Sequence, residues 1–158
     1  MNDNGLIFKD EQIANVARKL GLQKKVVKDV LEEYIGRLLN GICAGKTVKV
    51  FNICYLRVNK DLTTRETETL AYTATEVGKV VGVPSNTAYR CISSFSDQIV
   101  SDLQRDRRVS IRGLIRVQLN QEGKLRVKKS TSYNGDDVYV ITLGSFKRRV
   151  ETYAGKNS

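Results

Sequence analysis

The sequence predicts an α+β protein built from two similar units in tandem. Three observations lead to this fold class. Apolar residues recur first with helical spacing and then with strand-like alternation, this succession occurs twice, and further strand-like runs follow the second occurrence. The 158 residues are enough for one ordinary domain or two very small ones, with a core that needs no disulfide or metal ion.

The first unit begins with two predicted helices. Apolar side chains within residues 13–20 fall at positions i, i+3, i+4 and i+7, and Gly21 is placed to end that helix. A wide apolar stripe then runs through residues 26–42, which predicts a longer second helix that Gly41 and Gly45 end.

Two short strands are expected after these helices. Val48 and Val50 alternate with Lys49, the alternation is disturbed at residues 52–54, and it resumes at residues 56–58. This pattern predicts two strands that are joined at a bend. The first unit therefore has the order helix, helix, strand, strand.

A constant shift along the chain lays this unit on a second one without a gap. The shift is 77 − 16 = 61 positions, and the matched pairs include Val16 with Val77, Gly21 with Gly82, Val48 with Val109, Tyr34 with Phe95, and Val58 with Leu119. Few residues are identical, so the repeat is one of pattern. We expect Tyr34 and Phe95 to be core anchors.

The chain is expected to consist of a first unit at 1–60, a linker at 61–71, a second unit at 72–130, and a C-terminal β-extension with a basic tail at 131–158. Strand-like runs at residues 124–129 and 138–143 flank Asn134 and Gly135. Asn-Gly between such runs is a strong hairpin signal, so we expect an extra C-terminal β-hairpin.

The composition argues against catalysis and against metal binding. Histidine is absent, which removes the residue most used as a general acid or base and as a zinc ligand. The three cysteines, Cys43, Cys54 and Cys91, are odd in number and lack CxxC spacing, so we expect buried thiols in a reducing compartment. We expect no enzyme, no cofactor and no metal.

Two weaker signals of nucleotide binding or catalysis each lack a feature that the function requires. Residues 44–47, Ala-Gly-Lys-Thr, are similar to a phosphate-binding loop, but the required earlier glycine is Asn40 and the order is helix then strand. Carboxylates such as Glu32 and Glu33 are adjacent, with nothing to separate their pKa values.

The charge balance predicts an anionic partner. Lys and Arg number 27 against 17 Asp and Glu, which gives a formal net charge of +10. Such an excess favours a polyanion or acidic protein neighbours. No leader and no apolar run of about 18 residues is evident, so we expect a soluble protein with no membrane partner, in the cytoplasm or inside a particle made there.

The positive charge is concentrated between residues 105 and 129, on the second predicted strand pair and its extension. The expected nucleic-acid contacts are Arg112, Arg116, Lys124, Arg126, Lys128 and Lys129, with Lys147, Arg148 and Arg149 as a second patch. Cations on such a surface displace phosphate counterions, which gives salt-sensitive affinity without sequence preference. A face docked on acidic protein and a merely solvated face are the alternatives.

The unit resembles the bacterial histone-like HU and integration host factor (IHF) family. The resemblance rests on two helices with a Gly-Leu turn, a Gly-Lys turn and then "TVKVFNICYLRVNK", and again on "RRVSIRGLIRVQLNQEGKLRVKK" in the second unit. It spans roughly residues 10–130 as a tandem duplication. It implies an intramolecular pseudo-dimer, a non-catalytic architectural protein that binds double-stranded DNA non-specifically and is associated with the nucleoid.

The sequence departs from the family pattern at the bends and at the arm. Asn52 and Cys54 replace the bend glycines of the first unit, and only Gly113 survives in the second. The arm-tip proline, which wedges between base steps, has no counterpart, because the only proline is Pro84 at the start of a helix. Intercalative kinking is therefore not expected.

Two other functions fit the sequence. The first is a structural protein of a phage virion, a head-to-tail connector or ring subunit that reuses the HU/IHF-like fold without its DNA-bending parts. Such a subunit would contact acidic virion or portal proteins, form a homo-oligomer, and add the strands at 124–143 to a neighbour's sheet. Residues 75–92 resemble a helix-turn-helix of a transcription regulator. In that reading the groove-facing residues are Ser85, Asn86, Thr87, Tyr89 and Arg90.

Overall fold

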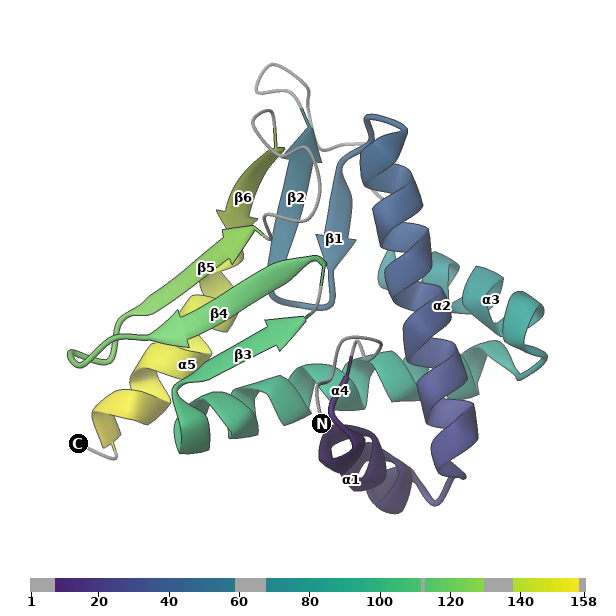
Figure 1. Cartoon of the computed structure of the whole chain (residues 1–158), viewed down its shortest axis with the longest axis horizontal. Coiled ribbons are helices and arrows are strands. Elements are labelled where there is room, and N and C mark those ends of the chain that lie inside the picture. The colour runs from purple at the N-terminus through teal and green to yellow at the C-terminus, as the bar shows by residue number, and fades with distance from the viewer. Residues whose placement is uncertain (1–7, 59–67, 112, 130–137, 157–158) are drawn as a thin grey trace, which may run out of the picture.

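The computed structural model describes residues 8–58, 68–111, 113–129 and 138–156, and within them it has five helices and two three-stranded antiparallel sheets (Figure 1). The predicted α+β class is confirmed. The elements are α1 (Asp10–Leu20), α2 (Lys24–Cys43), β1 (Val48–Val50), β2 (Cys54–Val58), α3 (Leu70–Val81), α4 (Ser85–Asp106), β3 (Arg108–Ile111), β4 (Ile115–Leu119), β5 (Leu125–Lys129), β6 (Val138–Thr142) and α5 (Gly144–Lys156).

The succession α1, α2, β1, β2 recurs as α3, α4, β3, β4. α2 begins at Lys24 and α4 at Ser85, a difference of 85 − 24 = 61 positions, and β2 and β4 differ by the same 61 at both ends. Gly21 and Gly82 follow α1 and α3 with φ of 68° and 87°, the left-handed conformation that glycine adopts without strain. The repeat of elements read from the sequence is therefore present in the fold.

Each half of the repeat has its own sheet, and both sheets are built alike. β6 pairs with β2 so that Val140 lies opposite Leu56, and β5 pairs with β4 so that Val127 lies opposite Val117. Leu56 and Val117 correspond to each other in the repeat, since 117 − 56 = 61. The third strand therefore has the same register in both sheets.

The C-terminal strands do not form the expected hairpin, because β5 and β6 belong to different sheets. Val138 and Val140 are the reason, since on β6 they continue the core-facing side of β2. Each of the two strands pairs on one side with a strand of its own chain, and each is the outer strand of its sheet, so the phage-protein alternative, in which these segments extend a neighbour's sheet, is not tested by this pairing. The Asn134-Gly135 turn lies outside the described residues.

In Figure 1, α1 and α4 lie below the two sheets, α2 runs upright beside β1, and α5 lies behind β4 and β5. α1 contacts both α2 and α4, and α3 contacts both α4 and α2, so the first helix of each half packs on its own long helix and also on that of the other half. Described buried apolar residues from both halves belong to one continuous core. None of the described helices combines the length and the apolar character that crossing a membrane requires.

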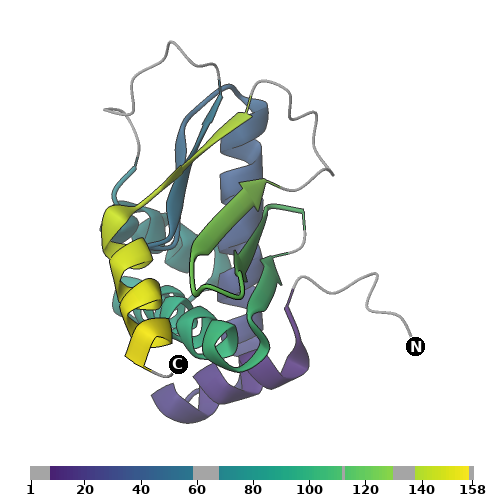
Figure 2. The same cartoon turned by 90° about the vertical axis from the view of Figure 1, so that its left-hand side faces the viewer.

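The C-terminal basic tail expected from the sequence is the helix α5. It lies against β5 on the side of the sheet away from solvent, as two views show (Figures 1 and 2). Phe146 and Val150 are buried, and Glu151 Oε2 accepts a hydrogen bond of 2.8 Å from the Leu125 backbone N–H. That contact satisfies a donor which the β4–β5 pairing does not use.

Four aromatic rings connect the halves. The Phe95 ring centroid in α4 lies 4.7 Å from that of Phe8 and 5.3 Å from that of Phe51, and Tyr34 lies 4.9 Å from Phe51. Tyr34 and Phe95 are both buried, which confirms them as core anchors. Phe51 occupies the first bend with φ of 50°, a conformation in which a non-glycine residue is strained.

Two further predictions need correction, the C-terminal boundary of the linker and the burial of Cys43. α3 begins at Leu70, where the Thr69 side chain accepts a hydrogen bond from the Tyr72 backbone N–H, so the expected linker at 61–71 overlaps its first turn. Cys43 is exposed, because α2 ends at this residue and its apolar stripe no longer faces the core there.

The other two cysteines are buried, as expected from the sequence. Burial raises the pKa of the Cys54 thiol to about 12 and that of Cys91 to about 11. At neutral pH both side chains are therefore neutral thiols, which have little nucleophilic reactivity.

Candidate nucleic-acid interface

The solvent-facing side of the β3-β4-β5 sheet carries four cations. The strands alternate in sequence, so every second side chain points away from the core. We call Arg108, Arg116, Arg126 and Lys128 the basic sheet face. All four are exposed, and the strands that carry them contain no acidic residue.

The register brings these cations close together. Arg116 lies directly opposite Lys128, and Gln118 lies between Arg108 and Arg126 on the neighbouring strands. Like charges directly opposite each other destabilise an antiparallel pair. The arrangement therefore weakens the isolated sheet and favours binding of an anion that spans several positive charges.

The basic sheet face contains three of the six predicted strand contacts: Arg116, Arg126 and Lys128. Lys124 is exposed in the turn before β5, where its backbone N–H donates to Asn120 Oδ1 at 2.9 Å. Lys129 has the opposite parity, and its Nζ donates to the Val138 carbonyl at 3.1 Å, so it does not belong to this face. Arg112 lies outside the described residues.

The predicted second patch lies on α5, on the other side of the same sheet (Figure 2). Lys147 and Arg148 are exposed there. Arg149 Nη1 lies 3.1 Å from Asp97 Oδ1 of α4, an ion pair that fixes α5 to α4. The two predicted patches are therefore separate surfaces.

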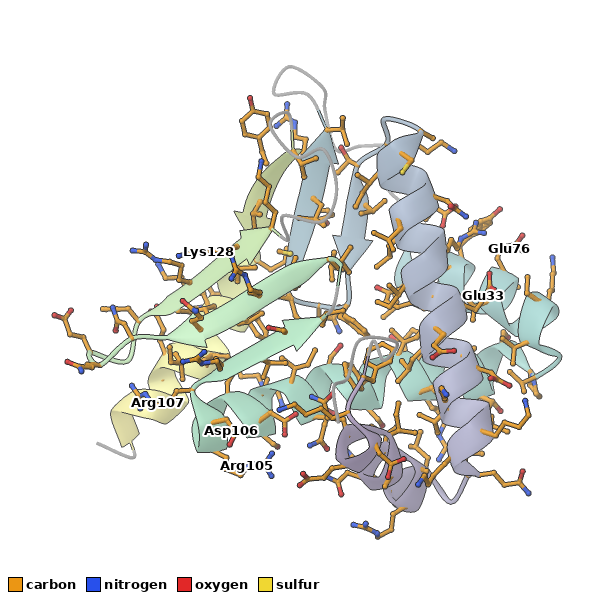
Figure 3. The ribbon with its side chains drawn as sticks, viewed as in Figure 1. Glu33, Glu76, Arg105, Asp106, Arg107 and Lys128 are labelled. Carbon is orange, nitrogen blue, oxygen red and sulfur yellow. The ribbon has the colours of Figure 1, made fainter. Side chains whose placement is uncertain are left out.

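Arg108 belongs to the basic stretch of the sequence but was not among the expected contacts, although the alternation Arg-Val-Ser-Ile places it on the same side as Ser110. Arg105 and Arg107, which precede it in the sequence, contact other residues. Arg105 contacts Glu11 at 3.1 Å and Asp106 at 3.1 Å, which lowers the pKa of Asp106, and Arg107 donates to the Asn120 carbonyl. Figure 3 shows the Arg105 and Asp106 side chains at the end of α4.

Acidic residues gather on the opposite side of the molecule. Figure 3 shows Glu33 on α2 and Glu76 near α3, away from Arg107 and Lys128. A groove between α2 and α3 is lined by Asp29, Glu32, Glu33, Val80 and Val81. Within the described residues, no cluster of three Asp, Glu or Cys side chains is arranged to hold a metal ion.

The two other sequence motifs lie in structural elements. α4 continues for 22 residues, and Phe95 and Ile99 in its middle are buried, so the proposed recognition helix is a core helix that is exposed mainly at its two ends. Residues 44–47 connect α2 to β1, which is the reverse of the strand-to-helix order of a phosphate-binding loop.

We compared the chain with protein-family models, with curated proteins and with solved structures, and none of the three comparisons found a match.

Proposed function

We propose that this chain binds double-stranded DNA without sequence preference, as a tandem HU/IHF-like architectural protein. The observation that carries the proposal is the basic sheet face: four exposed cations on three adjacent strands with no acidic residue among them. Such a surface neutralises several phosphates at once and releases their counterions.

The arrangement of the halves supports the pseudo-dimer in this proposal. Both halves have the same element order, a constant offset along the chain and the same register of their third strand. The first helix of each half packs on the long helix of the other half as well as on its own. Such reciprocal contacts are what two copies of one unit are expected to show when they pair within one polypeptide.

The chemistry of the face favours contacts with phosphates over base reading. Its four cations project from the solvent-facing side of one sheet, and Pro84 precedes α4 and lies in neither sheet. Because no proline is placed in the sheets to insert between base steps, the DNA is held by charge, and binding does not require the DNA to be kinked. We therefore propose similar affinity for unrelated duplexes.

Neutralising three members of the face should flatten the salt dependence of binding. In the triple variant Arg116→Gln, Arg126→Gln, Lys128→Gln, the slope of log affinity against log salt should fall by about 2.7, because each lost phosphate contact removes about 0.9. Fluorescence anisotropy with a labelled duplex at several salt concentrations measures this slope.

Lys129→Gln is the matched control, since Lys129 is adjacent in sequence but points to the other side of the sheet. Its slope should equal that of the unmodified chain. A triple variant that retains the full slope, or a Lys129 variant that loses as much as the triple, excludes the basic sheet face as the DNA contact.

A further inference from the structure

The solvent-facing side of the β1-β2-β6 sheet has a different chemistry. Its register places Tyr55 opposite Ile141, and Arg57 opposite Tyr139. We call Tyr55, Tyr139 and Ile141 the aromatic sheet face. Tyr139 is 39% exposed and Ile141 is 37% exposed, and both belong to the small set of large apolar side chains that the described residues expose.

The aromatic sheet face occupies the same positions as the basic sheet face. The offset between the halves superposes Tyr55 on Arg116, and the shared register of the third strand superposes Ile141 on Lys128 and Tyr139 on Arg126. One half of the repeat thus presents cations where the other half presents two aromatic rings and an aliphatic side chain. The three side chains adjoin one another on paired strands, and contiguous apolar surface, unlike single scattered side chains, is a feature of interaction sites.

The surroundings of the aromatic sheet face are positively charged. Lys49 lies opposite Tyr55 on the solvent-facing side of β1, and Arg57 lies opposite Tyr139, two positions along β2 from Tyr55. Arg57 Nε is buried without a hydrogen-bond partner among the residues that the structure describes. A ligand for this face therefore combines flat apolar groups with negative charge.

The two sheets are joined by a side-chain hydrogen bond at the ends of β5 and β6. Lys129 at the end of β5 donates to the carbonyl of Val138 at the start of β6, at 3.1 Å.

Tyr55 and Tyr139 are diagonal neighbours on the paired strands β2 and β6. Diagonal neighbours are about 7–8 Å apart, a distance that two consecutive unstacked bases can bridge.

We propose that the aromatic sheet face stacks unpaired bases of single-stranded DNA, with phosphates held by Lys49 and Arg57. Stacking on aromatic rings combined with cations along the backbone is how single strands are bound without sequence preference. This inference rests on the proposed function and extends it. The chain then contacts duplex DNA through one half of the repeat and an unpaired strand through the other.

A tryptophan at position 139 tests the stacking directly. The chain contains no tryptophan, so Tyr139→Trp introduces a single indole on the aromatic sheet face. Adding a polythymidine oligonucleotide should quench its emission. Tyr89→Trp is the matched control, because Tyr89 is exposed to a similar extent, 41%, but lies on α4. Its emission should not change.

Tyr139→Ala tests the energetic role of the ring. Its affinity for polythymidine should fall by about 5- to 100-fold, which corresponds to the loss of one base stack. Its affinity for a duplex should change by less than about twofold, because the basic sheet face is intact. Tyr139→Phe should bind the single strand as the unmodified chain does, since stacking needs the ring and not the hydroxyl.

The outcomes separate this inference from the function on which it rests. Unchanged affinity of Tyr139→Ala for polythymidine, or equal quenching in the Tyr139 and Tyr89 tryptophan variants, overturns the stacking role while duplex binding persists. An equal loss of duplex and single-strand affinity in Tyr139→Ala also overturns it. Absence of binding to any duplex by the unmodified chain rejects the proposed function itself.

Discussion

Replacing Phe95 with alanine should lower the free energy of unfolding by about 3–5 kcal/mol. Phe95 is 1% exposed in the middle of α4, and its ring contacts Phe8 before α1 and Phe51 in the first bend. Removing it leaves a cavity between segments from both halves of the chain. Because the halves share this core, we expect one cooperative transition in which they unfold together.

Denaturant unfolding followed by circular dichroism measures the effect as a lower midpoint with an unchanged slope. Tyr89→Ala on the same helix is the control, and since Tyr89 is exposed its stability should change by less than about 0.5 kcal/mol. If Phe95→Ala does not fold, Phe95→Leu should show a smaller loss. A Phe95→Ala protein as stable as the control contradicts the shared core.

Replacing Tyr34 with phenylalanine should cost about 1–3 kcal/mol, although only one oxygen is removed. The Tyr34 hydroxyl donates to the Lys49 carbonyl at 3.1 Å and accepts from the Phe51 backbone N–H at 2.7 Å. These bonds hold the first bend where Phe51 has a positive φ. In the variant, the Phe51 N–H remains buried without a partner.

The pH dependence gives this prediction a second readout. Burial raises the pKa of the Tyr34 hydroxyl, so the folded state holds its proton at a pH where the unfolded chain releases it, near pH 10. The contribution of Tyr34 is complete below pH 10 and is lost as the pH rises further. The stability difference between the unmodified chain and Tyr34→Phe should therefore narrow above pH 10.

Tyr72→Phe is the matched control for both readouts. Tyr72 is 48% exposed on α3, where the Arg37 guanidinium lies 5.8 Å from its ring centroid, a contact that phenylalanine retains. Thermal or denaturant unfolding at pH 7 and at several values above pH 10 distinguishes the two variants. A Tyr34→Phe protein with unchanged stability at pH 7 contradicts the anchoring of the bend by this hydroxyl.

Local patterns in the sequence predicted most of the fold, because each repeated element carries its own periodicity. The stripe in α2, the glycine after α1 and the alternation in β3 and β4 depend only on residues a few positions apart. The bend in the first unit was visible as a disturbance at residues 52–54. The role of the Tyr34 hydroxyl there was not, since it depends on a contact 17 residues away.

Long-range pairing was not predictable from the sequence. In the sequence, β6 has the pattern of the second strand of a hairpin. It joins the other sheet because β2 has an open edge and because the valines of β6 continue the core-facing side of β2. α5 reads as a basic tail because its buried face consists of few residues, Phe146 and Val150 among them.

The candidate interface was predicted in part, since charge clustering is local but strand parity decides which cations share a face. Arg108 and Lys129 show this. The first belongs to the basic sheet face without having been selected, and the second was selected but reaches the Val138 carbonyl instead.

The most direct test of DNA binding is a titration of two labelled duplexes of unrelated sequence with the unmodified chain at several salt concentrations. The account predicts equal affinities for the two duplexes and a linear fall of log affinity with log salt, with a slope of about −3.6 or steeper if all four cations of the basic sheet face contact phosphates. No binding at low salt, or affinity that differs strongly between the duplexes and is independent of salt, would contradict it.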